Sequence, residues 1–580
     1  MSAKSFGTAK SFGTATSRKT AALLEALLAW AAARHRNAAI LLVAVSLLAF
    51  LPGIFQLPPI DRDEARFAQA TKQMLETGDL VDIRFQEESR YKKPVGIYWL
   101  QAAVVGAAET LGLPEARTRI WLYRVPSILG AVGAVLLTYW TALAFVSRRG
   151  AVLAGLMMGS CILLAVEARL AKTDAVLFAT TVASMGAMAR AYLIERAQRP
   201  DPGHPWALPA IFWTAMAAGF LIKGPLIVMV VGLTVAALAI ADRSARFVLR
   251  LRPLAGLAWM LLLVLPWFVA IVLKSGAGFF EESLGRDLLS KVGSGQEAHG
   301  APPGYYFLLF WGTFFPASIL VPMAFGAVWK SRSVPEVRYL LAWLIPTWLV
   351  FEAAMTKLPH YVLPVYPAVA ILLAMAIDHQ ALSRNIWLRR APMWWFILTA
   401  VVSVGLIVIN IWIGQRFGPT TWLLSGIALT LALFAWWLFE ADGVVVSFMR
   451  MVIAMIVLFT AAFSATFPTI GTLFPSLQLA RFVAFGRCDQ VLAATAGYHE
   501  PSLVFLVGTD VRHVSGAGAA DFLARGGRCR YAFVEKGHER AFVQRADAIG
   551  LRYAQGVRID GVNYSSGRAV SIQTFVGVDP

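Results

Sequence analysis

The stretch Ala38–Leu57 reads AAILLVAVSLLAFLPGIFQL, and Pro58–Arg66 continues it as PPIDRDEAR. The first part is apolar over about 20 residues, the length that a helix needs to cross ~30 Å of hydrocarbon. The second part alternates carboxylates and guanidinium groups directly beside it. Because no small-residue cleavage site follows the apolar run, it is interpreted as a retained anchor rather than a signal peptide. The two parts together predict a membrane helix that leads into a charged segment at the bilayer surface.

The composition of the whole chain agrees with a membrane location. Of its 580 residues 58% are hydrophobic and only 15% are charged, which argues against a series of soluble domains. The formal net charge is +18. Nucleic acid is not expected as a partner, since the hydrophobic chain leaves no broad soluble face for a basic patch. The three cysteines argue against a disulfide scaffold and against a cysteine metal cluster.

The distribution of arginine and lysine between apolar runs predicts the topology. Further apolar runs lie near 96–113, 121–146, 151–168, 174–193, 206–222, 224–242, 252–273, 304–329, 337–356, 361–378, 394–414, 420–440 and 449–470. If every run spans the membrane, Arg148 and Arg149 lie outside, against the tendency of short basic loops to remain in the cytoplasm. Removing the run 96–113, which contains Gln101 and Glu109, moves the arginine-rich loops inside. The sequence therefore predicts about thirteen spans, with 96–113 as an interfacial or re-entrant helix.

The predicted fold class is an α-helical polytopic membrane protein with a small α/β domain outside the membrane. Residues 1–37 form a basic cytoplasmic arm, 38–470 the membrane domain and 471–580 the outer domain. Two large outer loops cover 58–120 and 274–303. In the outer domain, strands are expected at 502–507, 531–534 and 570–576, and helices at 479–494, 517–526 and 538–549. A disulfide between Cys488 and Cys529 is left open, because sequence does not show whether their Cβ atoms approach.

Charged and aromatic residues recur on the predicted outer side. The candidates are Asp63, Glu64, Arg66, Tyr91, Lys92 and Lys93 in the first outer loop, Asp174 and Lys223 at two helix junctions, Arg286 in the second loop, and Lys357, His360 and Tyr361 at a further junction. Each feature also has a plain structural explanation: local ion pairs in a solvated loop, an aspartate cap, a snorkelling lysine or interfacial aromatic residues.

The recurrence of these groups on one side favours a functional interpretation. Two carboxylates and several cations beside the bilayer suit a lipid-linked phosphate whose sugar is displaced at the anomeric carbon. A divalent metal ion remains open, with Glu88 and His299 as candidate ligands, although no close spacing supports them. A transporter or lipid flippase is the rival class, and it predicts charges near the bilayer midplane and inverted repeats.

Five motifs, in their order along the chain, resemble the C-type glycosyltransferases that use polyprenyl-phosphate sugars. They are Asp-Arg-Asp-Glu-Ala-Arg at 61–66, Tyr-Lys-Lys-Pro at 91–94, Arg-x-x-x-x-Asp at 169–174, Lys-Gly-Pro at 223–225 and Lys-Leu-Pro-His-Tyr at 357–361. Within that superfamily the chain looks most like the lipid A 4-amino-4-deoxy-L-arabinose transferases of Gram-negative bacteria. Val95 follows Pro94, where the related motif has a second proline, so the choice between Lys92 and Lys93 stays open.

The resemblance implies transfer of aminoarabinose from undecaprenyl phosphate to lipid A phosphate at the periplasmic face of the inner membrane, which gives resistance to polymyxin and cationic antimicrobial peptides. It places Asp63 and Asp174 at the acidic catalytic positions, and Lys93, Lys223, Arg286 and Lys357 at phosphates of donor or acceptor. Membrane lipid is a further expected partner. The alternative within the superfamily is a protein O-mannosyltransferase-like enzyme that uses another polyprenyl-phosphate sugar.

Overall fold

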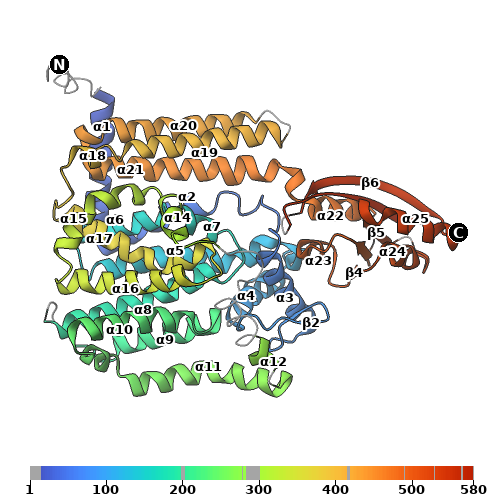
Figure 1. Ribbon diagram of the computed structural model, residues 1–580, viewed down its shortest axis with the longest axis horizontal. Coiled ribbons are helices and arrows are strands. Elements are labelled where there is room, and N and C mark those ends of the chain that lie inside the picture. The colour runs from blue at the N-terminus through green and yellow to red at the C-terminus, as the bar shows by residue number, and fades with distance from the viewer. Residues whose placement is uncertain are drawn as a thin grey trace.

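The computed structural model describes residues 15–197, 203–276, 278–282, 301–414, 418–486, 488, 490–527, 529–563 and 566–578. Long helices lie side by side along one direction, and a small domain built on a β-sheet covers one end of the bundle (Figure 1). We call this the sheet end and the opposite end the α1 end.

The bundle is built from apolar helices that follow one another along the chain. They are α2 (His35–Phe50), α5 (Ile120–Ala142), α6 (Arg148–Gly159), α7 (Ile162–Glu167), α8 (Asp174–Glu195), α9 (Ala207–Lys223), α10 (Leu226–Asp242), α11 (Pro253–Ser275), α14 (Tyr305–Thr313), α15 (Val321–Lys330), α16 (Pro335–Ala353), α17 (Tyr366–Asp378), α19 (Met393–Trp412), α20 (Pro419–Trp437) and α21 (Phe439–Thr460). Short helices α12 (Gly278–Phe280) and α18 (Ile386–Arg389) and the 3₁₀ helix η7 (Pro359–Val365) connect some of them.

The chain is a multi-pass membrane protein. Among the described residues, 7 helices are long and apolar enough to cross a membrane. The number is 8 if the bent pair of segments Tyr305–Thr313 and Ala317–Lys330 forms one span. Shorter apolar helices lie at His35–Phe50, Ala207–Lys223 and Leu226–Asp242. The count of about thirteen spans therefore stays a prediction.

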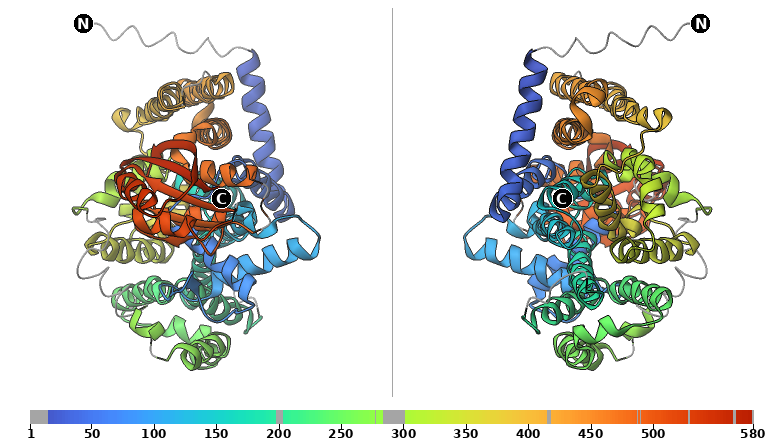
Figure 2. Two further views of the ribbon diagram at one scale, coloured as in Figure 1. Left: turned by 90° about the vertical axis from the view of Figure 1, so that its right-hand side faces the viewer. Right: turned by 90° about the vertical axis from the view of Figure 1, so that its left-hand side faces the viewer.

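Two helices lie across the direction of the bundle. The helix α4 (Gly96–Thr110) has 15 residues, fewer than a span needs, and is absent from the span candidates found in the described chain. It projects sideways at the sheet end (Figure 2, light blue), as an interfacial helix would. The helix α1 (Ala15–Ala33) lies across the opposite end (Figure 2, dark blue).

Several arginine-rich loops, which the sequence predicts to lie in the cytoplasm, meet at the α1 end of the bundle. Arg196 Nη2 lies 2.6 Å from an oxygen of Asp242, and Arg338 donates to the other oxygen of the same carboxylate. Arg148 Nη1 donates to the carbonyl of Ala32 in α1 at 3.0 Å. The predicted gathering of the arginine-rich loops is therefore present in the fold.

The first outer loop packs at the sheet end. It contains α3 (Asp63–Thr77), a hairpin of β1 (Arg84–Phe85) and β2 (Glu88–Ser89), and α4. The following domain has five strands in the order β4-β3-β5-β7-β6. They are β3 (Leu492–Ala496), β4 (Arg512–His513), β5 (Arg530–Glu535), β6 (Tyr553–Val562) and β7 (Ala569–Gly577). β3 pairs in parallel with β4 and β5, whereas β7 is antiparallel to β5 and β6.

Alternating side chains of β5 bury both faces of this sheet. Tyr531 and Phe533 point into a core that α22 (Pro475–Phe485) and α23 (Pro501–Val507) cover. Ala532 and Val534 point into a second core beneath α24 (Gly516–Leu523) and α25 (Glu539–Ala548). The predicted small α/β domain is thus a sheet between two helical layers.

Some predicted elements of this domain are wrong in type or extent. The run 502–507, predicted as a strand, is the helix α23, because Pro501 occupies a first-turn position and a short buried apolar run carries no decisive period. The helix expected over 479–494 ends at Phe485, and strand β3 follows from Leu492. The strands at 531–534 and 570–576 are confirmed. Cys488 and Cys529 form a disulfide, which settles the pairing that the sequence left open.

Candidate active site at the outer helix junctions

Three of the predicted site residues come together although they lie far apart in sequence. Asp174 begins α8, Lys223 ends α9 and His360 lies in η7. Lys223 Nζ donates to Asp174 Oδ1, and His360 Nε2 lies 3.5 Å from the same oxygen. The junctions of three membrane helices therefore meet at one carboxylate.

Two further residues complete a group that we call the outer charge cluster: Glu167, Lys172, Asp174, Lys223 and His360. Lys172 Nζ lies 3.0 Å from Glu167 Oε2 and 3.5 Å from Asp174 Oδ2. His360 Nδ1 lies 3.7 Å from Glu167 Oε1. Sequence reasoning placed Glu167 inside an apolar run and overlooked it. The available signal was a carboxylate within a predicted span, which is itself an indication of function.

The cluster is strongly electrostatic and almost closed. Burial opposes the charge of Lys172, but the carboxylates of Glu167 and Asp174 raise the pKa of its ammonium above the ordinary value, and Asp63 adds to this effect. Lys172 therefore stays cationic at neutral pH. A cavity of about 10 Å³ remains beside Asp174, room for about one water molecule.

Tyr361 forms part of the wall of this small cavity. The ammonium of Lys223 lies 5.5 Å from the centre of the Tyr361 ring, within the range of a cation–π contact. The rings of His360 and Tyr361 meet edge to face at 5.0 Å. Two predicted residues of the fifth motif thus lie at the cluster: His360 contacts its carboxylates, and the ring of Tyr361 contacts Lys223.

Asp63 lies near the cluster and is exposed. It occupies the first turn of α3, where the helix dipole favours a carboxylate. The preceding residue, Arg62, has φ 69°, a conformation that is costly for a residue with a Cβ atom. The strained turn presents the Asp63 carboxylate at the surface while the next residue points inward.

Glu64 is one of the candidate substrate-binding residues, and its side chain is directed into the protein. Its side chain is 2% exposed, and its two oxygens accept four hydrogen bonds: two from Arg124 and one each from the backbone amides of Ile60 and Ala171. A carboxylate offers about four acceptor positions, so all are used within the protein. In this arrangement Glu64 joins the Asp63 turn to Arg124 and to the loop before α8.

All five N–H donors of the Arg124 guanidinium form hydrogen bonds, and two of these bonds go to Glu64. Besides the two bonds to Glu64, it donates to the carbonyls of Ile54, Leu57 and Pro58 at 2.8 to 3.0 Å. Because Ala171 lies between Glu167 and Asp174 in sequence, this buried pair ties the Asp63 turn to the loop that carries Lys172.

The remaining residues of the first two motifs differ in burial and in their contacts. The Tyr91 hydroxyl donates to Asp82 at 2.8 Å, and its ring packs on Phe279 of α12. Lys92 is exposed and Lys93 half-buried. Arg66 is half-buried, and its charge acts on Asp61.

Lys357 is directed elsewhere than the cluster. It is buried, and its Nζ donates to the carbonyl of Ala301 at 2.8 Å. Arg286 and His299 lie outside the described residues. Glu88 is exposed in β2, so the expected metal pair of Glu88 and His299 receives no support from the fold.

Three residues of the outer charge cluster have the ligand types that could bind a divalent metal ion. Glu167, Asp174 and His360 each offer one ligand atom, and these atoms lie within 4.8 Å of one another. However, the ammonium groups of Lys172 and Lys223 already neutralise these carboxylates. A divalent cation would have to displace two positive charges, so the donor set does not fit one in this arrangement.

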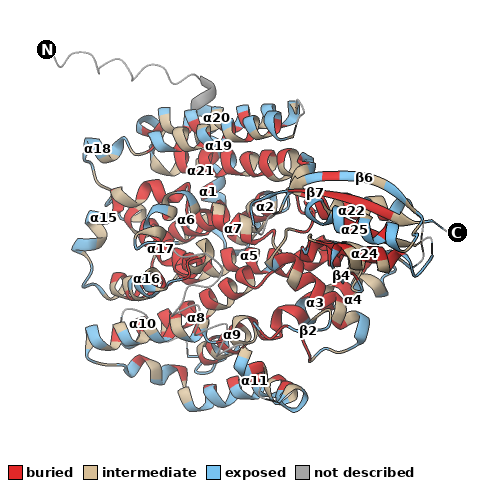
Figure 3. Ribbon diagram, turned by 45° about the vertical axis from the view of Figure 1, so that its right-hand side comes forward, coloured by how far each residue is buried: buried red, intermediate tan, exposed pale blue. Residues whose placement is uncertain are grey.

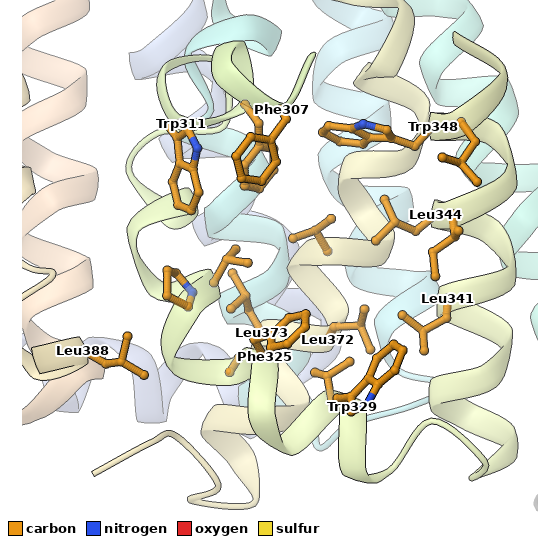
Figure 4. Close-up of a pocket in the computed structure, with 18 residues that line it drawn as sticks. Phe307, Trp311, Phe325, Trp329, Leu341, Leu344, Trp348, Leu372, Leu373 and Leu388 are labelled. Atoms are coloured by element: carbon orange, nitrogen blue, oxygen red, sulfur yellow. The ribbon is translucent and has the colours of Figure 1, made fainter. Parts of the chain in front are cut away.

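A large apolar pocket lies among the helices that flank η7 in sequence. It has a volume of about 740 Å³ and lies between α14, α15, α16 and α17. Trp311, Phe307 and Trp348 line one end, and Phe325 and Trp329 line the other (Figure 4). Phe310 in its wall contacts the ring of Tyr366, six residues after His360. An elongated apolar chain would be suited to this pocket.

Comparisons with known proteins identify the class of fold. A family profile described as dolichyl-phosphate-mannose-protein mannosyltransferase matches residues 40–277. The crystal structure of ArnT from Cupriavidus metallidurans bound to undecaprenyl phosphate superposes with a TM-score of 0.73 and 20% identity, covering 92% of this chain and 97% of that chain. Its apo form gives 0.71. The chain thus has the C-type glycosyltransferase fold that its motifs predict.

Curated relatives give a more particular likeness. The undecaprenyl phosphate-alpha-4-amino-4-deoxy-L-arabinose arabinosyl transferase of Pectobacterium carotovorum is 29% identical over 370 residues, which cover 61% of this chain and 62% of that protein. The protein of the same name from Aeromonas salmonicida is 28% identical over 350 residues, 58% of this chain and 61% of its own length. The chain therefore matches about three fifths of the length of these relatives.

Proposed function

We propose that this protein transfers 4-amino-4-deoxy-L-arabinose from undecaprenyl phosphate to phosphate groups of lipid A. The observation that carries the proposal is the outer charge cluster, where two lysines and two carboxylates meet at helix junctions of a C-type glycosyltransferase fold. The names of the curated relatives supply the sugar and the lipid carrier. The acceptor follows from the motif resemblance and from the chemistry below.

The reaction exchanges one phosphate for another at the anomeric carbon. The bond from that carbon to the donor phosphate oxygen breaks, and its electron pair leaves with undecaprenyl phosphate. An oxygen of the acceptor phosphate forms the new bond. Lys172 and Lys223 are suited to stabilise the charge on the leaving phosphate, because buried cations act strongly there. Asp174 holds Lys223 in place before the phosphate arrives.

Asp63 has a different task with such an acceptor. A phosphate monoester has a second pKa near ~6, so at neutral pH its oxygen is largely deprotonated and needs no general base. The exposed Asp63 carboxylate is suited to bind the ammonium of aminoarabinose and to orient the sugar. Lys93, in the same loop, is assigned to phosphate binding.

The apolar pocket gives the lipid carrier a place beside the charges. Its aromatic and aliphatic lining (Figure 4) suits an isoprenoid chain. In its wall, Phe310 contacts Tyr366, which directly follows η7, the segment that carries His360. The proposal thus sets the phosphate beside the almost closed cluster, within reach of the charge of its lysines, and the chain in the pocket between α14 and α17. Burial of the isoprenoid chain in the pocket then contributes most of the donor's affinity, and the charged residues orient its phosphate.

The proposal uses lysines rather than a metal ion at the cluster. Carboxylates that are already neutralised by Lys172 and Lys223 have little to offer a divalent cation. Protein freed of divalent ions by a chelator is expected to bind Mg²⁺ or Mn²⁺ no better than its Glu167→Gln variant. Tight binding that Glu167→Gln removes would instead place an ion at Glu167, Asp174 and His360.

A second candidate function is a protein O-mannosyltransferase-like activity with another polyprenyl-phosphate sugar. The family profile favours it, since its description names mannose and protein. A hydroxyl acceptor needs a base, and Asp63 would then take that part. A lipid flippase is less well supported, because the described cluster lies at helix ends rather than at mid-helix positions.

The orientation is part of the proposal. We place α1 and the arginine-rich loops in the cytoplasm and the cluster and the sheet domain in the periplasm, with the protein in the bacterial inner membrane. The disulfide of Cys488 and Cys529 supports this side, since such bonds persist in oxidising compartments. Added aminoarabinose would bring positive charge to lipid A and so weaken its attraction for polymyxin and other cationic peptides.

The deciding experiment supplies both acceptors to the purified protein in proteoliposomes. Lipid A or a hydroxyl-bearing peptide is incubated with undecaprenyl-phosphate aminoarabinose, and a parallel reaction uses a polyprenyl-phosphate mannose. Mass analysis should show aminoarabinose on lipid A alone. A mannosylated peptide together with unmodified lipid A would select the second candidate.

A further inference from the structure

A second polar cleft lies away from the outer charge cluster, between the first outer loop and the sheet domain. It has a volume of about 1030 Å³. One wall carries Gln73 of α3 and the β1–β2 hairpin, and the other carries the segment 509–514, Phe522 and Arg525. The elements α3, β2, β4 and α24 lie on the same side of the molecule (Figure 3).

The floor of the cleft is fixed by hydrogen bonds between the two walls. Gln86 Nε2 donates to the carbonyls of Thr509 and Val511 at 2.9 and 2.7 Å. Gln86 is itself held by Gln73 through two bonds, at 2.7 and 2.8 Å. The walls therefore keep a defined separation, which a preformed binding site requires.

The two walls differ in net charge. The sheet-domain wall carries Arg512, Arg525 and Arg530 with one carboxylate, Asp510, and the hairpin wall carries Glu87 and Glu88. Within the described part of the chain, Arg512 and Arg525 form no side-chain hydrogen bond or ion pair. Opposite charges in one cleft that stay apart leave room for a ligand to meet both walls.

Aromatic and neutral groups shape the rest of the cleft. The Arg530 guanidinium lies 5.1 Å from the centre of the Phe522 ring and donates to the carbonyl of Gly526 at 2.6 Å. Burial, together with the charge of His499, lowers the pKa of His513, although Glu88 opposes this. His513 is therefore neutral at neutral pH and available for hydrogen bonding.

We propose that this cleft binds a phosphorylated saccharide. Arg512 and Arg525 would hold phosphate oxygens, since guanidinium forks match their geometry, and Glu87 and Glu88 would accept from sugar hydroxyl or ammonium groups. Phe85, which is half-buried at the cleft, offers an apolar surface to a sugar ring. A purely anionic ligand would be repelled by the hairpin wall, and an uncharged one would leave the arginines unused.

The place of the cleft gives the ligand a part in the reaction, and this step rests on the proposed function. The helix α3 begins at Asp63 and reaches the cleft at Gln73, which is about 15 Å along its axis. One glycolipid headgroup could therefore present a phosphate near Asp63 while another part lies in the cleft. The cleft would thus hold the acceptor glycolipid by its phosphorylated saccharide.

Direct binding tests the inference without any need for transfer. The full-length protein in detergent is titrated with the fully deacylated phosphorylated disaccharide of lipid A, and with the same disaccharide after phosphatase treatment. The double variant Arg512→Ala with Arg525→Ala is expected to bind the phosphorylated form at least about tenfold more weakly. Arg540→Ala, an exposed arginine of α25 outside the cleft, is the matched control and should bind as the wild type does.

The outcomes separate the two proposals. Equal affinity of wild type and double variant for the phosphorylated disaccharide would overturn the cleft assignment, and so would equal binding of the dephosphorylated form. If transfer occurs, the double variant should raise the KM for lipid A and leave the KM for the donor unchanged. Absence of transfer by the wild type would count against the proposed function only, because the binding comparison still decides on the cleft. Melting temperatures equal to that of Arg540→Ala would show that the double variant is folded.

Discussion

Asp174 is the residue on which the cluster depends, because its carboxylate contacts Lys172, Lys223 and His360. Replacement by asparagine keeps the shape but removes the charge that holds both ammonium groups. We expect Asp174→Asn to lower kcat by about 100-fold or more, the usual effect of losing an electrostatic contact in a reaction centre. Initial rates of lipid A modification measure this.

A matched control removes a carboxylate from a surface ion pair. Asp521 pairs with Arg545 in the sheet domain, with about half of each side chain exposed. Asp521→Asn should keep the wild-type rate, since surface pairs contribute little. An unchanged rate in Asp174→Asn would remove that residue from the catalytic group.

Asp63 and Lys93 test the first outer loop. Asp63→Asn is expected to abolish transfer while the protein remains folded and inserted, because the exposed carboxylate meets the sugar rather than the protein interior. Lys93→Ala should weaken donor binding by about tenfold, the effect of one charge-assisted contact. Donor titration by fluorescence or calorimetry separates the two effects, and wild-type turnover by Asp63→Asn would contradict the assignment.

The elements around the site are held by the buried pair of Glu64 and Arg124. The pair joins α3, α5, the end of the α2 segment and the loop before α8. Truncating one partner leaves the other as an uncompensated buried charge, which costs about 3–5 kcal/mol. We therefore expect Glu64→Ala to lower the melting temperature sharply in detergent.

The comparison for Glu64→Ala is Glu539→Ala, which removes an exposed contact with Arg558. That change should cost at most about 1 kcal/mol. Circular dichroism melts of the two variants make the comparison. Equal melting temperatures would show that the buried pair does not hold these elements together.

The sequence predicted the elements of the site better than the tasks of single residues. The motifs at 169–174, 223–225 and 357–361 were expected on one side, and their side chains do meet. Glu64 was taken as a substrate-binding candidate from the local charge pattern. That pattern does not show that Glu64 pairs with Arg124, which lies 60 residues later in the sequence. Glu167 was missed because hydropathy averages conceal one carboxylate in an apolar run.

At the scale of the whole molecule, the first outer loop and the sheet domain form one contact surface. Asp61 accepts from the amide of Ser502 at 2.8 Å, and Lys72 donates to the carbonyl of Phe505 at 3.2 Å. Burial, and next the charge of Glu500, raises the pKa of Asp61 to about 7, against the bond from Ser502 and the charge of Arg66. The contact therefore contains the Asp61 carboxyl group, which ionises at a higher pH than an ordinary aspartate.

This contact should weaken as the pH rises. The pKa of Asp61 is higher in the folded protein than its ordinary value of 3.8, so its contribution is complete below about pH 4 and is lost as the pH passes about 7. Hydrogen exchange of α23 should be faster at pH 8 than at pH 6 after correction for the intrinsic rate. Asp61→Asn, which stays neutral and can still accept from Ser502, should remove most of this difference. An equal pH effect in that variant would exclude Asp61 as its source.

The disulfide reports the side of the membrane on which the sheet domain lies. Cys529→Ser frees Cys488, which an impermeant maleimide should then label from the periplasmic side in intact inner membranes. A cysteine placed at Ser244, between the arginines of the predicted cytoplasmic loop, should react only after lysis. The reverse pattern would invert the orientation.

The arrangement of the whole molecule was predictable in part. Counting basic residues singled out the run 96–113 among the apolar runs, and its helix α4 has only 15 residues. The number of spans and the side of each loop stay predictions. The contact of Asp61 with Ser502 and the cleft at Gln86 could not be predicted. Both join segments more than 400 residues apart through backbone groups that the sequence does not mark.

The central claim is that the outer charge cluster transfers aminoarabinose between phosphates. The most direct measurement is mass analysis of lipid A after incubation with undecaprenyl-phosphate aminoarabinose and the purified protein, in parallel with Asp174→Asn. We expect aminoarabinose on the phosphate groups of lipid A with the wild type and at most a trace with the variant. Lipid A left unmodified by the wild type, or modified equally by both proteins, would contradict it.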